Sequence, residues 1–332
     1  MLNTFKLYVE TDDIAPLQWE FNNKYPTLCK SLTFQVQGEL IDIINKKVRL
    51  IIGDDVVFTG FVDKIDIKYN DRIITNVTCY ESTYDFINST IPKQFTLNNK
   101  SVIASSVIRQ LIKQAKADIL LKSSKEYNFS INNYQIDRKK KTADFLNEIA
   151  SLCGCYINSS GYGELELTDR DSIATRNYNA DVLSGDISAK IDTTKLFNEY
   201  TLLSPKKNDI TNKNDWQTKY IKPPRGSKKN YIENTANNTQ FNRARNIVLL
   251  KNEPLTSSSN KKALDWIIKD ALETHQEFKF KVTISDLIIN AGEFLFMASN
   301  KRRFFNGKFF INDVRYTFNQ EGFTMEVKGV KL

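Results

Sequence analysis

The residues best suited to chemistry are two closely spaced cysteines and a single histidine. Cys153 and Cys155 are separated by one glycine, and His275 lies far from them in the sequence. A structural zinc site needs about four ligands, and the other two cysteines form no second pair. A nucleophilic serine or cysteine usually needs a positioned base, and the chain offers one imidazole. We therefore expect no metal centre, no cofactor and no nucleophilic catalysis.

Paired carboxylates are the other catalytic option, because two of them can hydrolyse a glycosidic bond. Glu164 and Glu166 alternate with leucines, so they share the outward face of a predicted strand. The glycines of Gly161-Tyr162-Gly163 do not suggest a phosphate-binding loop, because a short strand pattern rather than a helix follows them. The sequence favours a non-enzymatic protein and leaves a glycosidase as an open alternative.

Basic residues give the chain a net charge of +8, with acidic residues dispersed among them. This is more typical of a solvated surface than of a dense nucleic-acid-binding face. Short basic groups occur at Arg138–Lys141 and at Lys301–Arg303, and the latter group is expected at a hairpin tip. Further lysines lie in the polar stretch Ser204–Asn242, which has little periodicity and is predicted to be a long loop or an ordered arm.

Aromatic and basic side chains occur together in that predicted loop, a combination found at protein interfaces and on nucleic acid alike. We predict that the loop becomes ordered on a neighbouring protein and that five residues make the contact: Trp216, Tyr220, Lys222, Arg225 and Tyr231. A plain solvated loop is the alternative interpretation.

Strand-like alternation dominates the first segment, residues 1–92. Three strand patterns follow one another over Val48–Tyr80, with breaks at Gly53-Asp54-Asp55 and at Asn70-Asp71. Their period of two is typical of half-buried antiparallel strands. Gly60 interrupts one pattern, which predicts a bulge or a bend. A meander with such a bend favours a small barrel over a flat sheet.

The second segment, residues 93–187, is mixed. Helical spacing predicts a helix over residues 104–115 and another from Thr142 to Cys153, which Gly154 would end in a left-handed turn. A hairpin follows. The third segment, residues 188–332, returns to strands and adds a helix at 259–274 and a closing hairpin that turns at Glu321-Gly322. The predicted fold is therefore mainly β with an α+β insert.

The cellular location follows from what the chain does not contain. No apolar run approaches the ~20 residues that a membrane-spanning helix needs, and the N-terminus does not resemble a signal peptide. Four cysteines without a pairing pattern fit a reducing compartment. We expect assembly in a cytoplasm, with any release by lysis or as part of a particle.

Several stretches resemble the baseplate hub proteins of contractile tails. Val48–Asp63 is similar to the early strands of their first barrel, and Val77–Asn88 to the exit from that barrel. Lys141–Thr168 resembles their helix and hairpin element, and Asn306–Leu332 their closing strand pair. The layout is most similar to the hubs of PBSX-type prophages and Mu-like phages.

The resemblance implies two tail-tube-like antiparallel β-barrel domains that flank a mixed α/β domain. It also implies a homotrimeric ring with pseudo-sixfold symmetry that joins the tail tube to the central spike of a phage or an R-type tailocin. The implied partners are the tail tube protein, the spike protein and other baseplate proteins, and DNA could pass through the ring. Two alternatives stay open: a glycan- or surface-binding tail module, and a nucleic-acid-binding β-barrel protein.

Overall fold

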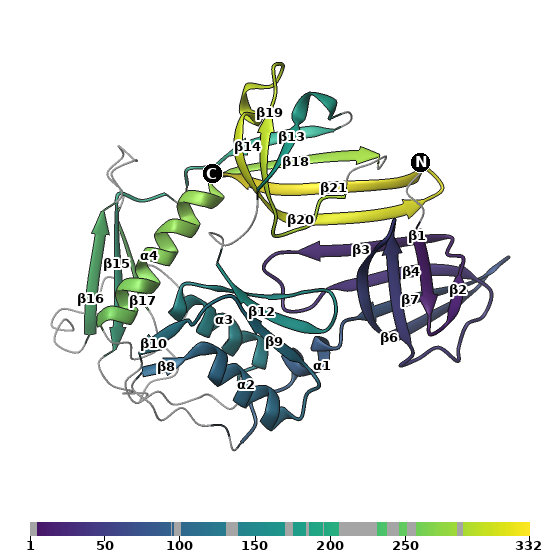
Figure 1. Ribbon diagram of the computed structural model, residues 1–332, viewed down its shortest axis with the longest axis horizontal. Coiled ribbons are helices and arrows are strands. Elements are labelled where there is room, and N and C mark those ends of the chain that lie inside the picture. Colours follow the sequence, from purple (N-terminus) through teal and green to yellow (C-terminus); the bar gives the residue numbers. More distant parts are fainter. Residues whose placement is uncertain are drawn as a thin grey trace.

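Strands make up most of the described structure, and helices are few (Figure 1). This arrangement confirms the predicted mainly-β class. In the computed structural model the described residues are 5–93, 95, 101–130, 139–169, 175–183, 186–194, 196–205, 231–237, 246–250, 257–283 and 288–332. Among them, no helix is both long enough and apolar enough to cross a membrane.

One 13-stranded sheet contains the strands of the first segment, most strands of the last segment and β13 from the end of the middle one. Its order is β14-β18-β21-β20-β3-β4-β7-β6-β5-β1-β2, with β19 and β13 branching from β20. Its strands are β1 Phe5–Val9, β2 Asp12–Ile14, β3 Gln18–Lys24, β4 Ser31–Gln37, β5 Lys47–Ile52, β6 Asp55–Tyr69, β7 Ile73–Tyr80, β13 Thr175–Asn179, β14 Ile187–Ile191, β18 Gln276–Thr283, β19 Phe294–Ala298, β20 Gly307–Asn319 and β21 Gly322–Lys331.

Local sequence explains strands β5 to β7. They occupy the three predicted strand patterns, and their breaks fall at the predicted turns. Gly60 does not itself form a bulge, since it pairs directly with Val48. The register of β6 shifts on either side of it, between Val56 and Phe58 and between Val62 and Lys64. Glycine is needed there for a different reason: a Cβ at position 60 would lie 2.3 Å from the Tyr80 carbonyl oxygen.

The first and last segments meet where β20 pairs antiparallel with β3. The core beneath them contains large aromatic side chains from both segments, including Trp19, Phe21, Phe34, Phe58 and Tyr316. Burying this much aromatic surface favours a permanent contact. The two segments therefore share one core and one sheet within the chain.

A second core belongs to the middle of the chain. Helices α2 (Ala104–Ala115) and α3 (Thr142–Cys153) lie where helical spacing predicted them, and Gly154 ends α3 with a φ of 66°. Around them lie β8 Ser101–Ile103, β9 Leu120–Ser123, β10 Asn128–Ser130, β11 Tyr156–Ser159, β12 Glu164–Thr168 and the short helix α1 Thr83–Asn88, which the sequence did not indicate.

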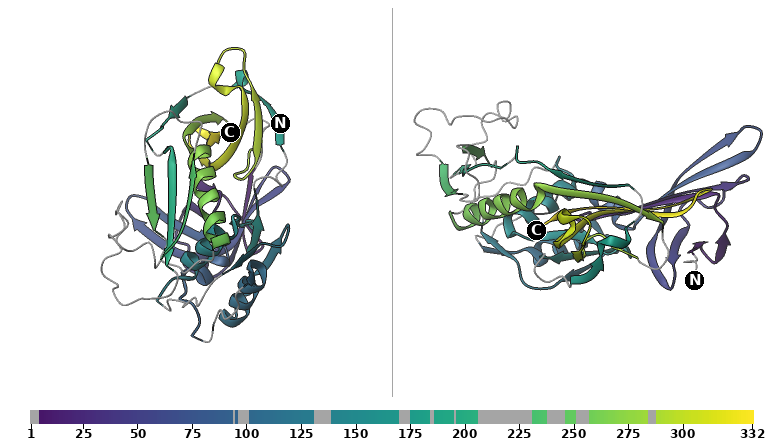
Figure 2. Two further views of the ribbon diagram at one scale, coloured as in Figure 1. Left: turned by 90° about the vertical axis from the view of Figure 1, so that its left-hand side faces the viewer. Right: turned by 90° about the horizontal axis from the view of Figure 1, so that it is seen from above.

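Part of the predicted last segment packs on this second core instead of on the large sheet. Helix α4 (Ser257–Thr274) contacts α3 and covers a small sheet of β15 Glu199–Pro205, β16 Tyr231–Asn237 and β17 Asn246–Leu250 (Figures 1 and 2). Leu202 and Leu264 contribute to the second core. Strand β16 also lies within the stretch predicted to be loop, where regular main-chain pairing with β15 overrides a weak sequence pattern.

Candidate functional site on the polar face of the sheet

The residues predicted to contact a partner are not brought together by the described structure. Trp216, Tyr220, Lys222 and Arg225 lie outside the described residues, and Tyr231 is described only as the first residue of β16. The contact made by this stretch therefore stays a prediction.

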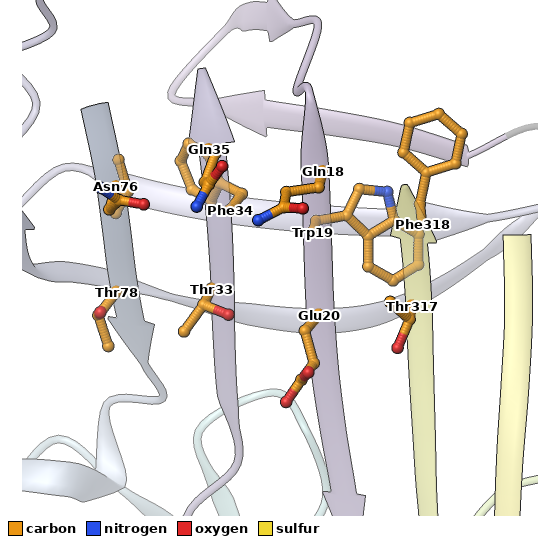
Figure 3. Close-up of a pocket in the computed structure, with 11 residues that line it drawn as sticks. Gln18, Trp19, Glu20, Thr33, Phe34, Gln35, Asn76, Thr78, Thr317 and Phe318 are labelled. Atoms are coloured by element: carbon orange, nitrogen blue, oxygen red, sulfur yellow. The ribbon is translucent and has the colours of Figure 1, made fainter. Parts of the chain in front are cut away.

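A second surface stands out, on the face of the large sheet that points away from its core. Two rows of polar side chains cross β20, β3, β4 and β7 (Figure 3). In one row Gln35 lies between Gln18 and Asn76. The other row consists of Thr317, Glu20, Thr33 and Thr78.

Alternation along each strand produces this face. Gln18, Glu20 and Asn22 alternate with the buried Trp19 and Phe21. The side chains of a strand point to opposite faces in turn, so the aromatic core and the polar rows are two consequences of one sequence pattern. That pattern is visible in the sequence, but the assembly of four strands into one continuous face is not.

The polar face is hollowed by two adjoining shallow depressions. The first has a volume of about 330 Å³ and lies over the polar rows. The second, of about 520 Å³, shares Gln18 and Gln35 with the first and extends to Arg72 and Glu321. Amide and hydroxyl side chains are the most numerous of the lining residues, so the surface can form hydrogen bonds.

Charges on the continuation of this face are largely paired with one another. The Glu326 carboxylate lies 2.8 Å from Lys279 Nζ and 3.1 Å from Lys328 Nζ, and Arg315 lies 3.6 Å from Glu20. Partial burial of Glu326 opposes its charged form, but hydrogen bonds from the two lysines outweigh burial and lower its pKa. The face is therefore polar without a strong field of either sign.

One buried polar cluster could be mistaken for an active site. Glu81 accepts hydrogen bonds from the Lys30 main-chain N–H at 2.8 Å and from the Ser159 hydroxyl. Burial raises the pKa of Glu81, while the Ser159 hydrogen bond and Lys30 oppose that shift; burial also lowers the pKa of Lys30. Perturbed pKa values can mark a functional site, but neither depression is lined by these residues.

The cluster instead fixes the middle of the chain onto the large sheet. Gly161 carbonyl oxygen accepts a hydrogen bond from Thr59 N–H at 2.9 Å, and the Tyr162 hydroxyl donates to the Val56 carbonyl oxygen at 2.6 Å. The β11–β12 turn thus docks between β6 and the Glu81 region. Because each segment supplies hydrogen-bonding groups that the other satisfies, we interpret the cluster as structural.

Two of the residues that the sequence suggested for catalysis, His275 and Glu164, have hydrogen-bond or ion-pair partners in the structure. His275 Nδ1 lies at the Leu272 carbonyl oxygen at the end of α4, and Nε2 lies 3.0 Å from Gln276. Glu164 on β12 forms an ion pair with Lys122 on the neighbouring strand β9. Within the part of the chain that the structure describes, no cluster of three or more potential metal ligands occurs.

Comparisons with known proteins give a clear result at the level of fold. No protein-family profile matches the sequence, and no curated protein is detectably similar to it. A 43 kDa tail protein of prophage MuSo2 from Shewanella oneidensis has a similar structure, with a TM-score of 0.77, 14% identity and 98% coverage of both chains. A tail protein from Neisseria meningitidis MC58 gives a TM-score of 0.75 with 13% identity, over 100% of this chain and 97% of that one.

A more distant similarity extends to secretion systems. An E. coli protein that is a component of the type VI secretion system has a TM-score of 0.59 and 9% identity, over 99% of this chain and 77% of its own. The chain thus has a fold similar to that of two tail proteins, one of them from a prophage, and of a type VI secretion component.

Proposed function

We propose that the chain is a structural hub of a contractile-tail baseplate, in a phage or a tailocin. The observation that carries the proposal is the full-length fold similarity to two tail proteins, one of them from a prophage, with 98% and 97% of those chains covered. One fold can host unrelated functions. What favours a shared role here is that the similarity covers whole chains rather than one small shared domain.

In this proposal three copies form a ring that joins the tail tube to the central spike. Each half of the large sheet acts as a tail-tube-like barrel unit, so three chains supply six such units. The polar face lines the central channel, where paired charges and amides would let a passing polymer slide without strong binding. The partners are the tube protein, the spike protein and other baseplate proteins, and assembly takes place in the bacterial cytoplasm before lysis.

The described surface supports this role over the two alternatives. A glycan-binding module usually presents exposed aromatic rings in a groove. Trp19 and Phe34 contribute to the lining of the first depression, but both side chains are buried in the core. A nucleic-acid-binding barrel would gather its basic groups on one face, but Lys301–Arg303 follows β19 and Lys139–Lys141 precedes α3, at separate places in the fold (Figure 1).

Mass photometry of the full chain, alone and with the proteins encoded beside it, tests the proposal. We expect a species of three times the 38.3 kDa chain mass, at least when tube or spike protein is present, because obligate assemblies can need their partners. Electron microscopy should then show a ring at the junction of tube and spike. A chain that stays monomeric with all neighbours present, or that is absent from purified particles, would refute the hub role.

A further inference from the structure

The large sheet contains two equivalent four-strand units. The first unit is β3-β4-β7-β6 and the second unit is β14-β18-β21-β20, and every neighbouring pair in both is antiparallel. The last strand of each unit is long and pairs with an outer strand over its first half, β5 for β6 and β19 for β20. Each also has a register shift at the corresponding place, between Val62 and Lys64 and between Ile311 and Asp313.

Among the strands that the structure describes, the two units pair with each other at one place. The second half of β20 pairs with β3, and Thr317 lies opposite Glu20. We call this contact the closed joint. The equivalent edges at the far ends of the row, the second half of β6 and the whole of β14, pair with no other strand among the described residues. These two edges are far from each other in space (Figure 1), so they cannot pair with each other within one molecule.

Hydrogen bonds show which main-chain groups of β6 face its free edge. Gly38 N–H donates to the Ile73 carbonyl oxygen at 2.9 Å, so odd-numbered residues of β7 point to β4 and even-numbered ones to β6. The even-numbered partners in β6 therefore point back to β7. The N–H and C=O groups left facing outward belong to Ile65, Ile67 and Tyr69.

The same reasoning applies to β14. Lys281 N–H donates to the Asp186 carbonyl oxygen at 3.1 Å, and Asp192 N–H donates to the His275 carbonyl oxygen at 2.7 Å. Even-numbered residues of this strand thus point to β18. The outward N–H and C=O groups belong to Ile187, Ala189 and Ile191.

Apolar side chains stand at the same positions on both edges. Tyr69 is 63% exposed and Ile191 is 64% exposed, which is unusual for large apolar residues beside unpaired strand edges. Polar residues alternate with them on each strand: Lys64, Asp66 and Lys68 on β6, Ser188 and Lys190 on β14. If the strands paired with their outward groups opposed, apolar residues would face apolar residues and polar residues would face polar ones.

We propose that the second half of β6 in one copy pairs antiparallel with β14 of a second copy. This open joint would be the intermolecular counterpart of the closed joint. The number of copies in the ring is taken from the proposed function, whereas the choice of the two edges does not depend on it. Because each copy gives a different edge to each neighbour, the contact is head-to-tail and generates a ring when the rotation closes.

The internal equivalence predicts the register of this pairing. Direct cross-strand pairs define one row in the first unit: Lys64, Thr78, Thr33 and Glu20. The matching row in the second unit is Asp313, Lys328, Lys279 and Ser188. Ser188 is therefore the counterpart of Glu20. In the closed joint Glu20 faces Thr317, the fourth residue after Asp313. The fourth residue after Lys64 is Lys68, so Ser188 should face Lys68.

Side-chain chemistry independently selects the same register. It places Asp66 opposite Lys190, Lys64 opposite Asp192 and Ile67 opposite Ala189. A slip of two residues in one direction would place Lys64 opposite Lys190, and a slip in the other would place Lys68 opposite Lys190. Opposed like charges destabilise a strand pair, whereas opposite charges and apolar pairs stabilise it. Topology, main-chain direction and charge thus agree on one register.

Disulfide cross-linking of the full-length chain tests this register. In the double variant Ile67→Cys/Ala189→Cys the two cysteines would be direct neighbours across the open joint, at about 5.5 Å between Cα atoms, which suits a disulfide. The matched control is Ile67→Cys/Ser188→Cys, because position 188 points to the opposite face. Each single variant measures background from the native thiols, of which Cys29 and Cys153 are partly exposed.

The assay uses mild oxidation under the conditions that give the ring, followed by a non-reducing gel. We expect dimer and higher bands for Ile67→Cys/Ala189→Cys, with at least a tenfold excess over both controls. A ring seen by mass photometry without this cross-link would overturn the open joint and leave the hub role standing. Absence of any oligomer, with or without tube and spike proteins, would overturn both.

Discussion

The closed joint and the proposed open joint both connect one four-strand unit to the next, the first within one chain and the second between two chains. At the closed joint, β20 and β3 bury Trp19, Phe21 and Tyr316 in the shared core. At the free edges, the corresponding side chains are smaller or exposed, and Tyr69 and Ile191 are more than half exposed. A contact that forms once, during folding, can therefore be stabilised by large buried aromatic rings. A contact made later between finished molecules needs edges that stay soluble until they meet.

Charge is the second difference between the joints. Across the proposed open joint, Lys64, Asp66, Lys190 and Asp192 supply two opposite-charge pairs. Across the closed joint, the ion pair Arg315–Glu20 is accompanied by a 3.3 Å hydrogen bond from Arg315 to Asn22. Charge contributes little to the strength of an exposed contact, but it suppresses wrong partners and fixes register. Register needs such protection most where two separate chains must find each other.

The largest effect should come from breaking the closed joint. Trp19 packs with ring centroids 5.2 Å from Phe5 and 6.5 Å from Phe318, so its removal leaves a cavity in the core that both segments share. We expect Trp19→Ala to lower the free energy of unfolding by about 3–5 kcal/mol. Urea unfolding followed by circular dichroism measures this loss. Leu17→Ala, at a residue that is 44% exposed, is the control and should change the midpoint very little.

The next effect should separate folding from assembly at the free edge. Ala189→Pro removes an outward-facing N–H from β14 but no hydrogen bond to β18, and proline is tolerated on edge strands. The variant should unfold at nearly the wild-type urea concentration yet fail to form the ring in mass photometry. Ser188→Pro removes an N–H that points to β18 and should destabilise the monomer itself. If Ala189→Pro assembles as well as the wild type, β14 is not an assembly edge.

A smaller effect should sharpen the register of the open joint. Asp66→Lys would place two lysines opposite each other, and we expect it to weaken assembly by roughly fivefold, consistent with about 0.2–1 kcal/mol per cross-strand pair. Lys190→Asp alone should do likewise. The double variant restores opposite charges and should recover most of the lost assembly in a concentration series by mass photometry. Equal losses that simply add in the double variant would argue against a direct contact between the two positions.

The smallest effect concerns pH and the paired charges of the polar face. The pKa of Glu326 is lowered in the folded state, so its ion pairs stabilise the fold above the unfolded value of about 4.3. That contribution is lost as the pH falls through the folded pKa. Glu326→Gln should therefore lower the urea midpoint slightly at pH 7 and reduce the drop between pH 7 and pH 3. Glu321→Gln, in the exposed β20–β21 turn, should leave both values unchanged.

The sequence by itself determined many of the local elements of this protein. Alternation set strands β5 to β7, helical spacing set α2 and α3, and Gly154 set the end of α3. The same alternation decided that Trp19 and Phe21 face a core while Gln18 and Glu20 face solvent. These features depend on neighbours within a few residues, so periodicity is enough to read them.

Only the tertiary structure decided how the elements join. The local pattern of β20 does not predict β3 as its partner. The polar stretch Ser204–Asn242 likewise does not predict that β16 pairs with β15. The docking of Gly161 beside Glu81 also required both segments in place. Any alternating strand can pair with many others, and the choice is made by the fit of whole surfaces, where side chains distant in sequence bury the same core.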